Sequence, residues 1–278
     1  MKVNHFFSRV VLVAITITVL AVLFDFISVG ISEYTDYLWV FLANLLISGV
    51  FGFYVVQSYY HSYKLWLATF IIYYVIGSFN ILIEALIFNV IDQSLTINAI
   101  LIGVPSSAFK SFIMILSFNR WRAKGNSIPN FLPRKLHHWI GRILVGNFLY
   151  FFFYFSAGIL LQAFTPRFAE FYGDKIPPLV DIVITNMFFR GFVFVGIAIL
   201  IDRTVLGSKF TKAVLIGIIF SIVGGIAPLI PPNEFMPVFI RVAHGFEVGI
   251  SNFLYGIFVY HIVSSKLPKQ IVLKSTSN

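Results

Sequence analysis

The 278-residue chain contains no cysteine and few charged residues. The lack of cysteine excludes a disulfide framework, thiolate catalysis and any metal site that needs cysteine ligands. Charged residues make up 11% of the chain, whereas about a quarter of an average soluble domain is charged. Together with a hydrophobic content of 59%, this deficit is typical of a protein that lies in a membrane.

The signature motifs of several enzyme classes are also missing. The chain has no GxxxxGK[ST] motif and no dinucleotide fingerprint, which argues against a nucleotide-driven pump. It has no HExxH motif and no intramembrane group of histidines, so we predict no metal centre and no cofactor. The net charge of +9 comes from basic residues in short connections between apolar runs. Membrane topology explains that distribution better than nucleic-acid binding, and we expect no nucleic-acid partner.

Eight apolar runs approach the length of about 20 residues that a membrane-spanning helix needs. They predict an all-α, polytopic integral membrane bundle of about eight transmembrane helices. The first run resembles the apolar part of a signal peptide, but it is longer and no clear cleavage site follows, so we expect it to be retained. The eight runs are Val10–Val29, Leu38–Gln57, Leu65–Val90, Ala99–Phe118, Ile143–Phe164, Leu179–Ile201, Ala213–Ile230 and Pro237–Ser264.

The connections between these runs alternate in charge. Lysine and arginine gather before the first run and after the second, fourth, sixth and eighth, whereas most acidic residues lie in the other connections. The positive-inside rule therefore predicts that both termini are cytoplasmic, and an even number of spans agrees with this. We predict a multi-pass protein of a bacterial inner or plasma membrane.

A basic stretch divides the chain into two four-helix halves. We predict a first half at 1–118, a cytoplasmic connector at 119–142 and a second half with a basic tail at 143–278. The connector is expected to contact anionic lipid headgroups, with a dedicated headgroup site or a membrane protein partner as the alternative. Segments 44–49 and 71–83 resemble 186–191 and 218–230 in the same order. The likeness indicates either a 4+4 internal repeat or chance similarity between apolar helices.

Ionisable residues occur inside the predicted spans. The stretch Met236–Ser264 carries Arg241, His244 and Glu247 on one side of a helix. Such groups are costly at membrane depth and normally face protein or water, so they are the best indication of a functional site. Because carboxylates and cations are balanced, we predict one largely neutralised cluster. Its remaining members come from other spans: Asp25, Asn80, Glu84, Lys110, Asn186 and Arg190. Glycine and proline in 103–107 and 224–232 also predict irregular backbone within the membrane.

These residues favour a transporter or permease for a small or lipidic substrate that is anionic or proton-coupled. Glu84, Glu247 and His244 would handle protons or cations. Lys110, Arg190 and Arg241 would bind the anionic group. One alternative is a membrane-embedded enzyme that acts on a lipid or isoprenoid, with His244 and Glu247 as its acid–base pair. The other is a non-catalytic membrane subunit of a larger complex, in which the charges only hold helices together.

One segment resembles a known signature. Residues 185–191, TNMFFRG, look like the Glu-Glu-x-x-x-Arg motif of the CAAX-processing type of intramembrane protease. Arg190 and Gly191 match, but Thr185 and Asn186 stand where that family has two glutamates. The family's later Phe-x-x-x-His resembles 220–224, where Gly224 replaces the histidine. The resemblance implies a relative without peptidase activity, because the carboxylates that activate water are absent, and we do not assign the chain to that family.

Overall fold

The computed structural model describes residues 3–28, 34–88, 91–122, 131, 133–165, 167, 170–171, 173, 177–233 and 236–264. Among these residues, every regular element is a helix, and eight helices are long and apolar enough to cross a membrane. The prediction of an all-α, multi-pass membrane bundle is therefore confirmed. Five spans are single α-helices: α1 (Val3–Ser28), α2 (Tyr34–Gln57), α5 (Gln93–Ser117), α6 (Leu136–Phe164) and α11 (Val238–Val263).

The other three spans each contain a wider π-helical turn. The third span consists of α3 (Ser62–Tyr74), η1 (Val75–Phe79) and α4 (Asn80–Ile87). The sixth consists of α8 (Leu179–Thr185), η3 (Asn186–Arg190) and α9 (Gly191–Thr204). The seventh consists of α10 (Lys209–Ile218), η4 (Ile219–Ile226) and the short η5 (Ala227–Leu229). Irregular backbone was thus predicted correctly in the seventh span, whereas α5 continues as a helix through Pro105.

Local capping explains where several spans begin. The Asp92 carboxylate accepts hydrogen bonds from the backbone N–H groups of Ser94 and Leu95 at the start of α5. Ser208 accepts one from the N–H of Thr211 at the start of α10.

The helix α6 begins seven residues before the predicted run, because its first two turns are polar and basic and hydropathy alone does not include them.

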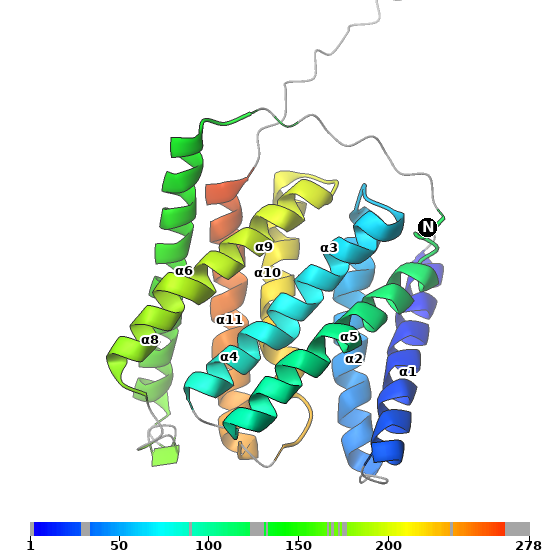
Figure 1. The fold of residues 1–278 in the computed structure, drawn as a ribbon, viewed down its shortest axis with the longest axis horizontal. Coiled ribbons are helices and arrows are strands. Elements are labelled where there is room, and N and C mark those ends of the chain that lie inside the picture. Colours follow the sequence, from blue (N-terminus) through cyan, green and yellow to red (C-terminus); the bar gives the residue numbers. More distant parts are fainter. Residues whose placement is uncertain are drawn as a thin grey trace, which may run out of the picture.

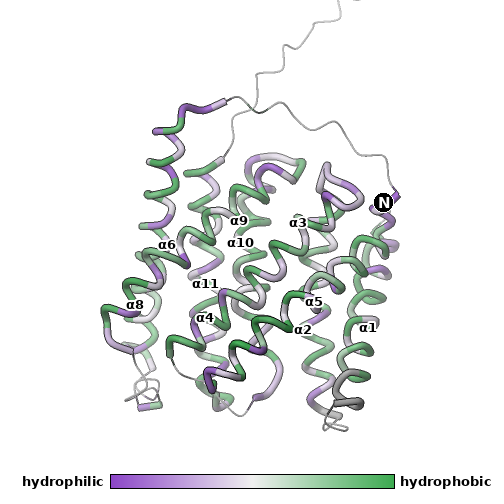
Figure 2. Tube along the Cα trace, in the orientation of Figure 1, coloured by the Kyte–Doolittle hydropathy of each residue, from purple (hydrophilic) through white to green (hydrophobic). Residues whose placement is uncertain are grey.

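The spans run up and down through the bundle, as Figure 1 shows. The beginning of α1 and the end of α11 lie at the same end of the bundle, which we call the terminal end; the opposite one is the distal end. Hydrophobic residues predominate along the helices and hydrophilic ones gather near their ends (Figure 2). The assignment of the terminal end to the cytoplasm stays a prediction.

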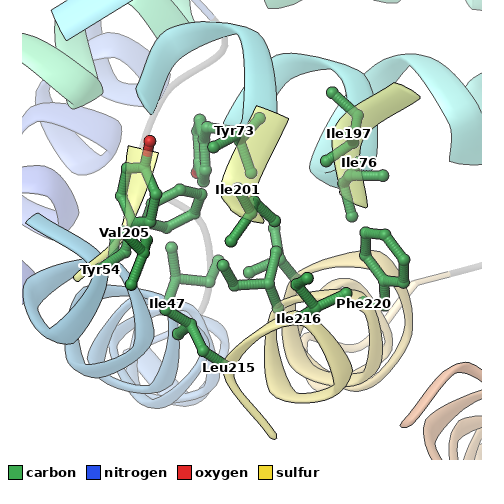
Figure 3. Close-up of a cluster of buried hydrophobic side chains, with 14 of the residues drawn as sticks. Ile47, Tyr54, Tyr73, Ile76, Ile197, Ile201, Val205, Leu215, Ile216 and Phe220 are labelled. Carbon is green, nitrogen blue, oxygen red and sulfur yellow. The ribbon is translucent and has the colours of Figure 1, made fainter. Parts of the chain in front are cut away.

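Helices from both predicted halves share one hydrophobic core. Figure 3 shows Ile47 and Tyr54 of α2 beside Ile201 of α9 and Ile216 of α10, all of them buried. The core is therefore continuous between the halves. Within the second half, the backbones of α10 and α11 touch at one crossing, since a Cβ atom on Gly256 would lie 2.6 Å from the Cα of Gly217. The division at 119–142 and the internal repeat stay predictions.

Candidate functional site

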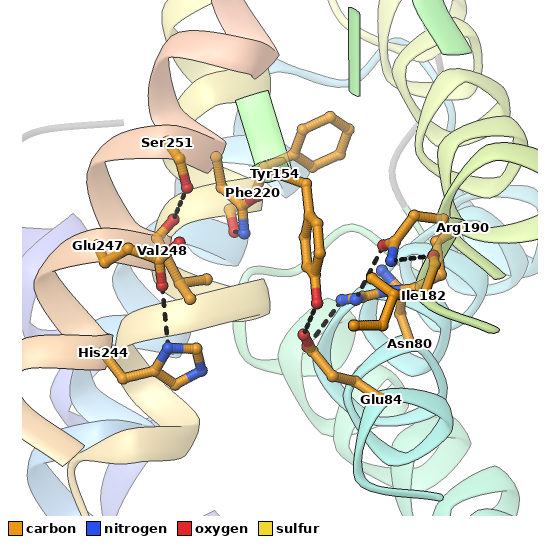
Figure 4. Close-up of polar contacts among 12 residues, drawn as sticks. Asn80, Glu84, Tyr154, Ile182, Arg190, Phe220, His244, Glu247, Val248 and Ser251 are labelled. Atoms are coloured by element: carbon orange, nitrogen blue, oxygen red, sulfur yellow. Dashed lines mark hydrogen bonds and ion pairs between the residues drawn. The ribbon is translucent and has the colours of Figure 1, made fainter. Parts of the chain in front are cut away.

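A buried arginine is the centre of a polar cluster inside the bundle. Arg190 is 6% exposed, and its guanidinium donates to three side chains (Figure 4). Nε lies 3.1 Å from Oδ1 of Asn80, and Nη1 lies 3.3 Å from Oδ1 of Asn186. Nη2 forms an ion pair of 2.9 Å with Oε2 of Glu84. One cation thus binds two amide oxygens and one carboxylate from two different spans.

Two π-helical turns position these groups. Asn186 and Arg190 begin and end η3, and Asn80 follows directly after η1. The amide of Asn186 donates to the backbone oxygen of Ile182 at 2.8 Å, which directs its own oxygen towards Arg190. At about 1.5 Å per residue, Arg190 lies about 16 Å along its span from the distal end. Wider turns of this kind are frequent at functional sites in proteins.

A glycine and an asparagine stabilise the turn that carries Arg190. The side-chain amide of Asn147, on α6, donates to the backbone oxygen of Met187 within η3 at 2.6 Å. Gly191 follows the turn, and a Cβ atom there would lie 2.1 Å from Oδ1 of Asn147. Only glycine therefore lets α6 approach this closely while Asn147 keeps its bond to the π-helical turn.

Two tyrosines of α6 complete the surroundings of the ion pair. The Tyr154 hydroxyl donates to Oε1 of Glu84 at 3.2 Å. The Arg190 guanidinium lies 5.5 Å from the ring centroid of Tyr154 and 5.9 Å from that of Tyr150. Sequence reasoning missed both residues, because 33 phenylalanines and 13 tyrosines conceal any single aromatic. The one available signal was the spacing of four residues between Tyr150 and Tyr154, in a run that otherwise contains mostly phenylalanine.

A histidine–glutamate pair on α11 faces the ion pair of Arg190 and Glu84. Nδ1 of His244 lies 2.9 Å from Oε2 of Glu247, and both side chains are less than a quarter exposed. Figure 4 shows His244 pointing towards the side of the bundle that holds Tyr154 and Glu84. His244 interacts electrostatically with Glu84 and Arg190, so the two pairs act on each other. Helix geometry places His244 and Glu247 about 9 Å and 14 Å along α11 from its distal start.

Ser251 does not join His244 and Glu247 in the arrangement of a serine hydrolase. The hydroxyl of Ser251 donates to the backbone oxygen of Val248 at 3.3 Å and does not bond to His244. Within the described ranges, no three histidine, cysteine, aspartate or glutamate side chains are grouped to hold a metal ion.

The structure brings together six of the nine candidate residues: Asn80, Glu84, Asn186, Arg190, His244 and Glu247. Lys110 lies apart, with Nζ 5.8 Å from the ring centroid of Tyr73, and it forms no ion pair with any described residue. Asp25 belongs to α1, but its side chain is outside the described part.

Arg241 is buried on α11, one turn before His244. It is 7% exposed, and its guanidinium forms neither a hydrogen bond nor an ion pair with the residues that the structure describes. Among the six residues that the structure brings together, Arg190 balances the charge of one of the two carboxylates, Glu84 and Glu247. A proton on His244 balances the charge of the other.

A hollow in the bundle lies away from the polar cluster. An apolar groove of about 640 Å³ runs between α1, α2, η4 and α11, lined by residues such as Val10, Leu46, Ile222 and Phe253. None of the polar cluster's side chains lines it. No family model, curated protein or solved structure matches the chain.

Proposed function

We propose that the protein is a transporter that carries a small anionic solute together with a proton through the polar cluster. The observation that carries the proposal is the pair of partly buried carboxylates, each bonded to a basic side chain. Glu84 is bonded to Arg190 at 2.9 Å and Glu247 to His244 at 2.9 Å. Such groups are retained within a membrane at a considerable free-energy cost, which a transport site would justify.

The ion pair can exchange its carboxylate for a substrate. When Glu84 binds a proton, its charge is lost and Arg190 keeps only neutral acceptors, Asn80 and Asn186. A carboxylate or phosphate of the solute then takes the place of Glu84 on the guanidinium fork. Proton and anion bind together in this scheme, and the release of one favours the release of the other.

The arrangement of the helices supports movement around the site. Its side chains come from the third, fifth, sixth and eighth spans, so binding of a solute acts on four helices at once. Two of these spans are interrupted by π-helical turns beside the site, where a helix can change its course. A membrane subunit with purely structural ion pairs gives no reason for those turns.

Proton-coupled flux in proteoliposomes tests this proposal. The purified protein is reconstituted with a pH-sensitive dye inside the vesicles, and inward gradients of organic anions, cations and neutral solutes are applied in turn. We expect at least one anion to acidify the interior of the vesicles. Glu84→Gln should abolish that proton movement, because the residue that exchanges with the substrate no longer titrates.

A matched control is available at the distal end. Glu170 is an exposed carboxylate outside the cluster, and Glu170→Gln makes the same chemical change. It should leave the proton movement unchanged. Acidification by no anion, or equal acidification by wild type and correctly folded Glu84→Gln protein, would contradict the proposal and favour a structural role for the ion pairs.

A further inference from the structure

A second polar group lies at the terminal end of the bundle, around Trp139 near the start of α6. The guanidinium of Arg134 lies 5.3 Å from the Trp139 ring centroid, and that of Arg203 lies 5.2 Å from it. Arg142 is one turn after Trp139 and interacts electrostatically with Arg134, as does Arg203. Two arginines, from α9 and from the segment before α6, thus share one indole, and Arg142 of α6 lies beside them.

The backbone of α11 fixes two of these arginines. Arg134 donates to the backbone oxygen of Ser264, and Arg142 donates to that of Ile262. Ile262 is in the last turn of α11 and Ser264 is its C-cap residue, at the end where carbonyl groups lack helical partners and the helix dipole favours cations. These bonds hold the guanidinium groups in place and leave part of each donor set for another ligand.

Two donors in this group are buried without an acceptor among the described residues. They are Nη1 of Arg134 and Nε of Arg203. A buried N–H group without a partner is unfavourable, because it has lost its bond to water and gained none in return. In the protein's working state we expect an acceptor at this place.

Carboxylates at this end are too few to supply that acceptor. Asp202 interacts with Arg134, but its carboxylate is paired at 3.1 Å with Lys212. The adjoining stretches 1–9, 58–64, 118–142, 205–212 and 264–278 contain no aspartate or glutamate at all. Burial lowers the pKa of Arg134, and neighbouring Arg142 lowers it further. The three arginines, Lys212 and Asp202 together carry a net charge of +3.

We propose that Arg134, Arg142 and Arg203 form a binding site for a phosphate group. Guanidinium forks match the oxygens of phosphate, and several of them around one anion are typical of phosphate recognition. The group can belong to the headgroup of an anionic phospholipid or to a soluble phosphate. Trp139 beside the arginines is a residue typical of the membrane interface, where a headgroup would lie.

Thermal unfolding of the full-length protein in a neutral detergent tests the site. The unfolding midpoint is titrated separately with phosphatidylglycerol, phosphatidylcholine and inorganic phosphate, and an apparent Kd is derived from each titration. We expect the wild type to be stabilised by phosphatidylglycerol or by inorganic phosphate. Arg203→Gln should weaken that binding about fivefold, because each basic side chain near a headgroup contributes about 1 kcal/mol of binding free energy.

Arg122→Gln serves as the matched control, since Arg122 is an exposed arginine at the same end and outside the group. Arg203→Lys keeps the charge but loses the fork, and an intermediate Kd is expected. Stabilisation by phosphatidylglycerol alone would identify a headgroup site, and stabilisation by inorganic phosphate a soluble ligand. Titrations that do not change in Arg203→Gln, or that weaken equally in Arg122→Gln, would overturn the proposal.

Discussion

Loss of the Arg190 charge should destabilise the bundle strongly. Arg190→Gln removes the ion pair at 2.9 Å and leaves Glu84 without a counter-charge inside the protein. Removing one partner of a buried ion pair typically costs about 3–5 kcal/mol. The Glu84 side chain is 24% exposed, so water compensates part of the loss and we expect about 3 kcal/mol.

The double variant separates the pair from other effects. Glu84→Gln alone leaves Arg190 uncompensated and should also be destabilising. Arg190→Gln combined with Glu84→Gln replaces two charges by neutral amides, so its effect should be smaller than the sum of the single effects. We expect a coupling free energy of about 2 kcal/mol, within the usual range for residues in direct contact.

Reversible unfolding in mixed micelles, followed by circular dichroism during titration with a denaturing detergent, gives the required free energies. Arg122→Gln removes an exposed arginine and should change the unfolding free energy by no more than about 0.5 kcal/mol. Additivity of the two single substitutions within about 0.5 kcal/mol would refute the reasoning, because contacting partners of an ion pair cannot be energetically independent.

Two further substitutions address the surroundings of the pair in the same assay. Gly191→Ala should destabilise the protein by about 1–3 kcal/mol, because the added methyl group clashes with Asn147. The control Gly158→Ala has open space around it and should leave the stability unchanged or slightly higher. Equal changes in stability for the two variants would contradict the close approach of α6. Tyr154→Phe should cost about 1 kcal/mol by removing the hydrogen bond to Glu84, and an unchanged stability would show that the bond is absent.

Much of the fold followed from the sequence because a bilayer imposes one dominant rule. Apolar runs of about 20 residues identify spans, and polar residues that interrupt them mark the interior. A spacing of four places Asn80 with Glu84 and Asn186 with Arg190 on common faces, and the structure brings these faces together. The partners of an ion pair could therefore be proposed before their contact was known.

Other features have no comparable signal. The π-helical turn η3 contains neither proline nor glycine, so its local sequence does not distinguish it from ordinary helix, and the only local signal in η1 is Gly77 followed by Ser78. Lys110 is a cation within a span, as Arg190 is, but it contacts Tyr73 instead. Which residues meet depends on helix rotation, and that is determined by the packing of the whole core.

The most direct test of the central claim is whether water reaches the polar cluster. The chain has no cysteine, so Ser251→Cys introduces a single thiol, one turn after Glu247, without background. Ile250→Cys is the control, because Ile250 is 60% exposed on the apolar outer surface of the bundle. Membrane-impermeant maleimide is applied to sealed vesicles of either orientation, with labelling in denaturing detergent as the reference.

A transport site predicts that Ser251→Cys protein reacts in sealed vesicles and Ile250→Cys protein does not. An anion that drives proton flux should also slow the reaction at position 251. If the thiol at position 251 stays as unreactive as the one at 250 in both orientations, while both react fully after denaturation, the cluster is dry and the transport account is wrong.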